Sequence, residues 1–200
     1  MQPTALYPCL YKQLFPQKTI ARDLLLILGG SLVVALLAQL RVPLPFTPVP
    51  ITGQTLGVTL VGATLGPRLG FLALLAYLVE GIVGAPVFAG GTAGIASILG
   101  PTGGYLIAYP ISAALVGFLV EWAGCDRQFF KMYGAMVLSS LIIFGLGTAW
   151  LGVWLTQAGR YAGLADLMMK AVVPFIPGDL IKSCISASLF PTVWRFLNRQ

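Results

Sequence analysis

The sequence predicts an all-α membrane protein whose helices form one bundle. Of its 200 residues, 58% are hydrophobic and only 9% are charged, whereas soluble domains carry about 25% charged residues. The mean hydropathy is +0.90, and several long runs contain no charged side chain. A chain of this length has room for one transmembrane domain and none for a separate soluble catalytic domain.

Six apolar stretches predict six membrane spans, each near the ~20 residues that cross a bilayer. The second ends at Pro67-Arg68, and the second and third are slightly short. We expect residues 1–20 to form an N-terminal cytoplasmic segment and residues 21–200 to form the six-helix domain. The predicted spans are Leu24–Leu40, Ile51–Gly66, Leu69–Gly84, Gly104–Val120, Met132–Thr156 and Gly178–Leu197.

The distribution of basic residues predicts the orientation of this bundle. With six spans and both termini in the cytoplasm, most Lys and Arg residues fall on the inner side, as the positive-inside rule requires. Only Arg41, Arg160 and Lys170 fall outside. We therefore expect a multi-pass protein of the cell membrane, with no cleavable signal peptide. The inner residues are Lys12, Lys18, Arg22, Arg68, Arg127, Lys131, Arg195 and Arg199.

The last predicted span contains an acid and a base, Asp179 and Lys182, after the proline-rich run Pro174–Gly178. Each charge costs about 2.5–3.5 kcal/mol to insert in a bilayer, so such residues commonly mark a functional site. Their i, i+3 spacing places both on one face of a helix, where each can offset the other. The pair either binds a ligand that has N–H donors and oxygen acceptors, or forms a structural ion pair that locks helices together.

The depth of this pair follows from the predicted orientation. Asp179 precedes Arg195 by 16 residues, which is roughly 24 Å of helix in a hydrocarbon core of about 30 Å. If Arg195 marks the cytoplasmic boundary, both charges lie in the outer half of the membrane. A ligand pocket there would open toward the extracellular side.

Two further outer segments contribute to this prediction. The run Leu44–Pro50 is rich in proline and precedes Thr52 and Gln54, which either bind a ligand or cap and solvate a helix end. Pro-Phe-x-Pro occurs there and again before Asp179, and proline corners can hold a cavity open at membrane depth. The glycine-rich run Ala85–Tyr105 either closes over a ligand or serves as a plain connector. Phe88 and Tyr105 lie near its edges.

Two other features each leave two interpretations open. Glu80, near the outer end of the third span, either carries protons in a coupled transporter or is solvated or paired with Arg41. Small residues in the first span, Ser31, Ala35 and Ala38, allow a close helix approach. That contact is either internal packing or a contact with a partner subunit.

The composition argues against several function classes. The chain has no His, and its three cysteines are isolated, so neither a metal site nor a disulfide framework is expected. It contains no GxxxxGK[ST] motif for ATP hydrolysis and no His for a protease site, so we expect no enzymatic activity and no cofactor. The net charge of +6 is ascribed to membrane topology rather than to nucleic-acid binding.

Five motifs in order resemble the BioY family, the biotin-specific substrate-binding (S) components of energy-coupling factor (ECF) transporters. The similarity runs from about residue 20 to 195. The motifs are Pro48-Val49-Pro50-Ile51-Thr52-Gly53-Gln54-Thr55-Leu56-Gly57, Leu65-Gly66-Pro67-Arg68-Leu69-Gly70, Pro86-Val87-Phe88-Ala89-Gly90-Gly91, Leu99-Gly100-Pro101-Thr102-Gly103-Gly104-Tyr105 and Pro174-Phe175-Ile176-Pro177-Gly178-Asp179-Leu180-Ile181-Lys182.

The resemblance implies a six-helix protein that captures biotin from outside. It would deliver biotin inward with a transmembrane T component and a pair of ABC-type ATPases. Some family members are thought to transport without dedicated partners. The small residues of the first span, here Ser31 and Ala35 with Ala38 a turn later, would meet the T component.

The resemblance also implies a set of binding residues. Asp179 and Lys182 match the acid and base of the Pro-Gly-Asp-x-x-Lys motif and would contact the polar groups of biotin, with Asp179 on the ureido N–H groups and Lys182 on an oxygen. The other predicted binding residues are Tyr105, Gln54, Phe88, Gly91, Thr92 and Gly94. Where some members carry an Asn in the glycine-rich loop, this chain has Thr92-Ala93.

Two alternatives remain open at this stage. One is a solitary or proton-coupled secondary transporter of a small carboxylate that uses Glu80 and Asp179. The other is a membrane enzyme that acts on lipid, for which the absence of His leaves few catalytic groups.

Overall fold

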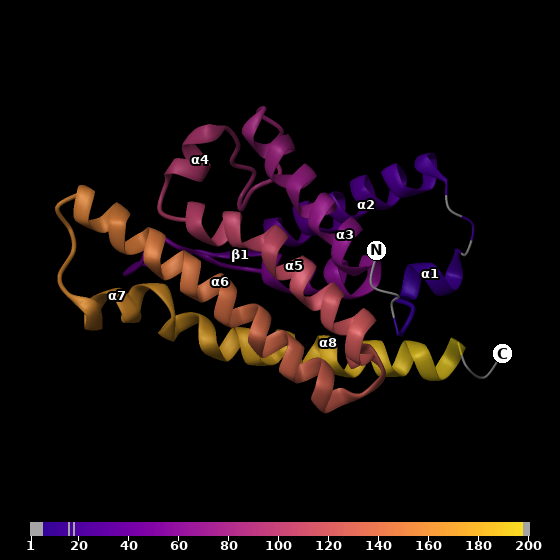
Figure 1. Ribbon diagram of the computed structural model, residues 1–200. Coiled ribbons are helices and arrows are strands. Elements are labelled where there is room, and N and C mark those ends of the chain that lie inside the picture. Colours follow the sequence, from indigo (N-terminus) through magenta and orange to yellow (C-terminus); the bar gives the residue numbers. More distant parts are fainter. Residues whose placement is uncertain (1–5, 16, 18, 198–200) are drawn as a thin grey trace.

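The structure, a computed structural model, describes residues 6–15, 17 and 19–197. Long helices lie side by side in a single elongated bundle (Figure 1). They are α2 (Ile20–Gln39), α3 (Gln54–Ile82), α5 (Gly103–Ala123), α6 (Phe129–Gln157) and α8 (Ile176–Leu197). The shorter elements are α1 (Leu10–Leu14), α4 (Ile95–Leu99), α7 (Leu164–Ala171) and the 3-10 turns η1 (Cys125–Arg127) and η2 (Val173–Phe175).

Helix α3 consists of two halves that meet at a sharp break. Gly66 has φ 72° and ψ −178°, a conformation open essentially to glycine alone, and Pro67 follows it. Beyond the break the chain turns back, because a Cβ built on Gly70 would lie 3.1 Å from the Cα of Gly62. The two halves therefore correspond to the predicted spans Ile51–Gly66 and Leu69–Gly84.

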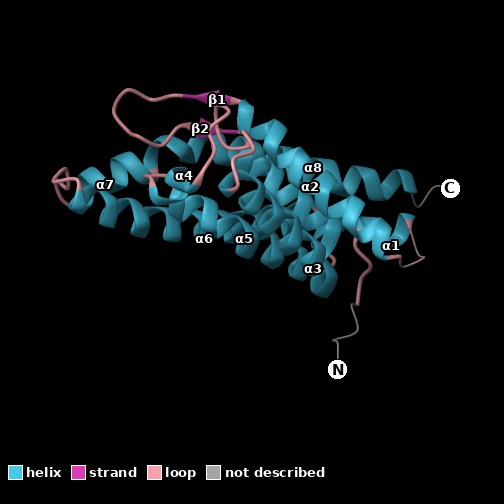
Figure 2. Cartoon of the chain, turned by 90° about the horizontal axis from the view of Figure 1, so that it is seen from above, coloured by secondary structure: helices cyan, strands magenta, loops and turns pink. Residues whose placement is uncertain are grey.

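The remaining predicted spans coincide with α2, α5, α6 and α8, although the ends differ by a few residues. The predicted start of the second span is wrong, because Ile51 lies in a strand and not in a helix. Residues Ile51–Thr52 form strand β2, which pairs antiparallel with β1 (Arg41–Val42). The proline-rich segment between them is thus the loop of a short hairpin, which lies over one side of the helices (Figure 2).

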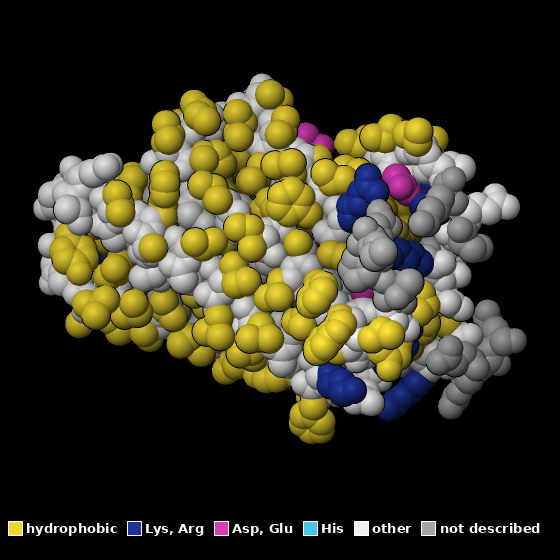
Figure 3. Space-filling view, in the orientation of Figure 1, with side chains coloured by type: hydrophobic (Ala, Val, Ile, Leu, Met, Phe, Trp, Pro, Cys, Tyr) yellow, Lys and Arg dark blue, Asp and Glu magenta, His cyan; other side chains and the backbone are white. Residues whose placement is uncertain are grey.

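Four of the described helices, α2, α3, α5 and α6, are long and apolar enough to cross a membrane. Hydrophobic side chains cover most of the face seen in Figure 3, while Lys and Arg gather toward one end. Such an apolar exterior is expected where the solvent is lipid. The chain is a multi-pass membrane protein, and the count of six crossings remains a prediction.

The basic end of the bundle is closed by the N-terminal segment. The Lys12 Nζ atom lies 2.6 Å from the Glu121 carboxylate at the end of α5, and the Arg127 guanidinium lies over the rings of Tyr7 and Trp194. Burial and the neighbouring carboxylate raise the pKa of the Cys9 thiol to about 12. The other end of the bundle carries α4, α7 and the β1–β2 hairpin (Figure 1).

The small residues of the first span face the inside of this chain. Ser31, Ala35 and Ala38 are all buried, and a Cβ on Gly30 would meet Ala73 of α3 at 2.9 Å. This burial supports the internal-packing interpretation of the stripe. The Ser31 hydroxyl donates to the carboxylate of Glu80, and no ion pair joins Glu80 to Arg41 within the part of the chain that the structure describes.

We predict that Gly66→Ala lowers the free energy of unfolding by about 1–3 kcal/mol, because it forces an L side chain into a glycine conformation. The added Cβ would also lie 2.5 Å from Glu121 Oε1. Thermal unfolding in detergent measures the effect. Gly29→Ala is the control, since a Cβ there meets nothing within 4 Å. Equal stability of the two variants would show that the break does not need glycine.

Candidate substrate-binding site

A cavity of about 260 Å³ lies at the end of the bundle opposite α1. Pockets for small molecules usually measure roughly 300–1,000 Å³, so this one suits a single compact ligand. Its wall comes from the β1–β2 hairpin, the start of α3, the glycine-rich run with α4, and the facing sides of α5, α6 and α8. Segments far apart in the sequence therefore share one site.

Most of the predicted site residues meet at this cavity. Those that line it are Asp179, Lys182, Tyr105, Gln54, Thr92 and Phe88.

Gly91 and Gly94 do not line the cavity, and their role stays a prediction. Both have positive φ, 72° and 86°, and they shape the loop that carries Phe88 and Thr92. In this loop the Phe88 N–H donates to the Thr92 carbonyl at 3.1 Å, and the Gly91 N–H donates back to the Phe88 carbonyl at 3.0 Å. The glycines thus turn the chain so that their neighbours form the wall.

The ammonium of Lys182 is held by the start of α3. Its Nζ donates to the Thr55 hydroxyl at 2.6 Å and to the Thr52 carbonyl at 3.1 Å. No ion pair joins Lys182 to Asp179 among the described residues. The structural ion pair considered from the sequence is therefore not what holds this lysine.

Asp179 faces the cavity from the first turns of α8. It also lines a second, much smaller space beside the cavity, of about 10 Å³, together with Ser140 of α6. Its carboxylate is half-buried. Because a half-buried carboxylate needs hydrogen-bond donors, Asp179 is suited to bind N–H groups of a ligand.

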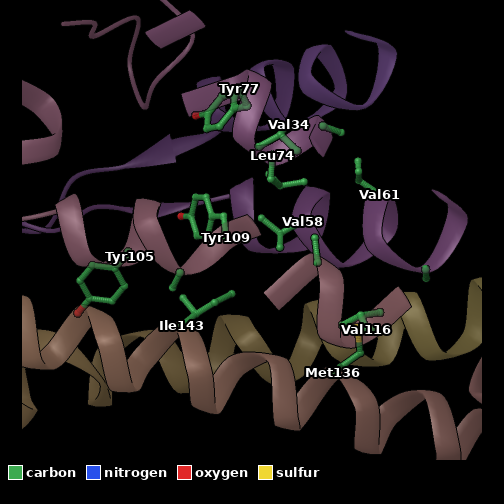
Figure 4. Close-up of a cluster of buried hydrophobic side chains, with 14 of the residues drawn as sticks. Val34, Val58, Val61, Leu74, Tyr77, Tyr105, Tyr109, Val116, Met136 and Ile143 are labelled. Atoms are coloured by element: carbon green, nitrogen blue, oxygen red, sulfur yellow. The ribbon is translucent and has the colours of Figure 1, made fainter. Parts of the chain in front are cut away.

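Gln54 is buried and bonded within the protein. Its Nε2 donates to the Tyr77 hydroxyl at 2.6 Å, and its Oε1 accepts from Thr52 at 2.9 Å and from Tyr109 at 3.4 Å. Tyr77 in turn donates to the Val87 carbonyl at 3.1 Å. Figure 4 shows Tyr77 and Tyr109 within the buried cluster, with their hydroxyls pointing the same way.

Tyr105 ties the cavity wall to α7. Its hydroxyl donates to the Ala171 carbonyl at 2.8 Å, and its ring packs against Phe175 with centroids 6.4 Å apart. One residue earlier, the Lys170 carbonyl accepts from the Thr47 hydroxyl of the hairpin loop at 2.8 Å. The end of α7 therefore anchors two parts of the wall.

The residue-by-residue prediction missed several wall positions. Thr55 follows Gln54 directly in a quoted motif, and Phe175 lies in the Pro-Phe-Ile-Pro run, so both had a motif to mark them. Tyr109 and Phe144 had no signal beyond being apolar helix residues. The further wall residues include Arg41, Val49, Thr55, Tyr109, Ile143, Phe144 and Phe175.

No group of His, Cys, Asp and Glu side chains that could hold a metal ion occurs in the described part of the chain. The cavity wall is mainly apolar and also carries the carboxylate of Asp179 and the cationic side chains of Lys182 and Arg41, so it can bind a small polar ligand.

Comparisons with known proteins show the family of this chain. The BioY family description matches residues 11–199. The chain belongs to the BioY family. It is 40% identical to the biotin transporter BioY2 of Lactococcus lactis over 173 residues, which is 84% of this chain and 88% of that protein. It is 41% identical to a probable biotin transporter BioY of Pyrococcus horikoshii over 136 residues, 68% of this chain and 75% of the relative.

A solved structure supports the fold. The crystal structure of the S-component for biotin from an ECF-type ABC transporter superposes with a TM-score of 0.77 at 27% identity, and the match covers 90% of this chain and 95% of that one. The BioY family consists of transporter S components rather than enzymes.

We predict that Tyr105→Phe lowers the free energy of unfolding by about 1 kcal/mol, because the buried Ala171 carbonyl loses its donor. Amide hydrogen exchange should also speed up in α7, which that bond anchors. Tyr133→Phe is the control, since no described residue bonds its hydroxyl. Unchanged exchange in α7 would mean that the Tyr105 hydroxyl does not anchor that helix.

Proposed function

We propose that this chain is the biotin-binding S component of an ECF-type vitamin importer. It captures biotin from outside and delivers it inward with a transmembrane T component and a pair of ABC-type ATPases. One observation carries the proposal. The acid and base of the Pro-Gly-Asp-x-x-Lys motif both line one apolar cavity that the hairpin and the glycine-rich loop also line.

The chemistry of the wall suits biotin. Asp179 accepts hydrogen bonds from the ureido N–H groups, and Lys182 donates to an oxygen of the ureido group or the carboxylate. The aromatic rings of Phe88, Phe144 and Phe175 pack against the apolar ring system and tail. These two roles follow from the chemistry of the groups, because a carboxylate only accepts hydrogen bonds and an ammonium only donates them.

The cavity opens toward the extracellular side in this proposal. It lies at the end of the bundle opposite α1, Lys12 and Arg127. The positive-inside rule assigns that basic end to the cytoplasm, with both termini.

The chain relies on partners for energy, since its sequence has no ATP-binding motif of its own. A proton-coupled mechanism through Glu80 gains no support from the geometry, because Glu80 bonds to Ser31 and is absent from the cavity wall.

We predict that Asp179→Asn and Lys182→Ala each weaken biotin binding by about 10- to 100-fold, the range of one charge-assisted hydrogen bond. Calorimetric titration of purified protein, with desthiobiotin and thiamine alongside biotin, measures the change. Asp166→Asn is the control, because it makes the same change at another half-buried aspartate, one that pairs with Lys170 at 2.7 Å and does not line the cavity. Full affinity in both site variants would overturn this assignment.

We further predict that uptake of biotin requires the partners. Cells that produce this chain with a T component and ATPases should accumulate labelled biotin, and inactivation of the ATPase P-loop lysine should abolish uptake while binding persists. Uptake that survives in cells without those partners would instead identify a solitary transporter. Loss of that residual uptake when the pH gradient is collapsed would identify proton coupling.

A further inference from the structure

We infer that Thr55 is a positioning residue of the binding site. Its hydroxyl, together with the carbonyl of Thr52, fixes the Lys182 ammonium so that one remaining N–H is directed at the ligand. The inference rests on the proposed function in one respect, namely that Lys182 contacts the ligand.

The geometry at Lys182 supports this role. An ammonium has three N–H donors, and two of them are used by Thr55 at 2.6 Å and Thr52 at 3.1 Å. Both Thr55 and Lys182 line the cavity. One donor is left, so Lys182 is equipped to bind one oxygen atom rather than to bridge several.

The residues that hold Lys182 are themselves held by further hydrogen bonds. Thr52 donates from its hydroxyl to the Gln54 side chain at 2.9 Å, and Gln54 is bonded to Tyr77 at 2.6 Å. Tyr77 reaches the Val87 carbonyl in the glycine-rich run. These bonds hold the first turn of α3 in place and give Gln54 a supporting role, while its direct contact with the ligand stays a prediction.

Prior fixation of a lysine matters for affinity. A free lysine side chain loses much rotamer freedom when it engages a ligand, and a site that has already ordered the chain avoids that loss on binding. Thr55 is the one side chain that bonds Nζ directly within the described residues, since the second bond goes to a backbone carbonyl. Substitution of Thr55 therefore removes the hydrogen bond from Lys182 to a side chain, while the hydrogen bond to the Thr52 carbonyl stays.

The test is Thr55→Val, which keeps the shape of the side chain and removes its hydroxyl. We expect biotin to bind about tenfold more weakly, as the loss of one such hydrogen bond implies, while Thr55→Ser stays within about threefold. Thr59→Val is the control one turn later. Its hydroxyl donates to the Leu56 carbonyl of its own helix at 2.9 Å, and it does not line the ligand cavity.

A double-mutant cycle separates positioning from packing. In the Lys182→Ala background, Thr55→Val should cause no further loss of affinity. An equal loss in both backgrounds, or full affinity of Thr55→Val alone, would overturn the inference.

A second measurement needs no ligand. Reductive methylation with formaldehyde and cyanoborohydride, followed by mass spectrometry, reports how freely Lys182 reacts. Lys182 should be modified faster in Thr55→Val than in the unaltered protein, Thr55→Ser or Thr59→Val, because its ammonium has lost a partner. Equal rates would overturn the inference even if biotin binds, and absence of biotin binding with unequal rates would overturn the proposed function alone.

Discussion

The structure depends on one constraint, that a polar group inside an apolar slab must find a partner within the protein. Lys182, a half-buried charged residue of α8, illustrates this constraint. The start of α3 meets it with a hydroxyl and a backbone carbonyl. Those two groups are available only because α3 begins at Gln54, directly after the β1–β2 hairpin.

The same constraint explains why the site lies where helices end. A helix interior uses its own carbonyls, whereas the chain before a helix has carbonyls that are free to accept. Thr52 precedes α3, and Lys170 and Ala171 end α7, and each of these residues accepts a side-chain bond through its carbonyl. The cavity is thus built where hairpin, loop and helix ends offer unpaired backbone groups. The middle of the bundle, around Val58, Leu74 and Val116, is a packed apolar core (Figure 4).

Much of the fold could be predicted from the sequence, because hydrophobic runs report directly on burial in lipid. The break is also visible in the sequence, because the second predicted span ends at Gly66 and Pro67 follows it. The strands and α7 were not predicted. Two-residue strands leave no periodic pattern, and α7 is too short and too mixed in composition to stand out from a loop.

Part of the site could likewise be predicted from the sequence, and part could not. Asp179 and Lys182 stand out because charges are rare in apolar runs, and the structure brings both to one cavity. Their i, i+3 spacing left two interpretations open, a ligand-binding pair and a structural ion pair, and no ion pair joins them among the described residues. Spacing along a helix makes a pair available, but here the Lys182 ammonium bonds instead to the Thr55 hydroxyl of α3 and the Thr52 carbonyl of β2. The motif that contains Thr55 marks the position but not its bond to Lys182, because that bond depends on how α8 packs against α3.

The arrangement also bears on how affinity arises in a site this small. If Asp179 and Lys182 were paired, a ligand would have to break an ion pair before binding, and the gain would be reduced by that cost. In the structure two of the three Lys182 N–H groups bond to neutral groups, and Asp179 lines the cavity without an ion pair to Lys182 among the described residues. A ligand with N–H donors can therefore reach the carboxylate without displacing a cation. In the proposed site, the lack of an ion pair between Asp179 and Lys182 among the described residues means that a ligand meets a carboxylate whose binding to it breaks no such pair.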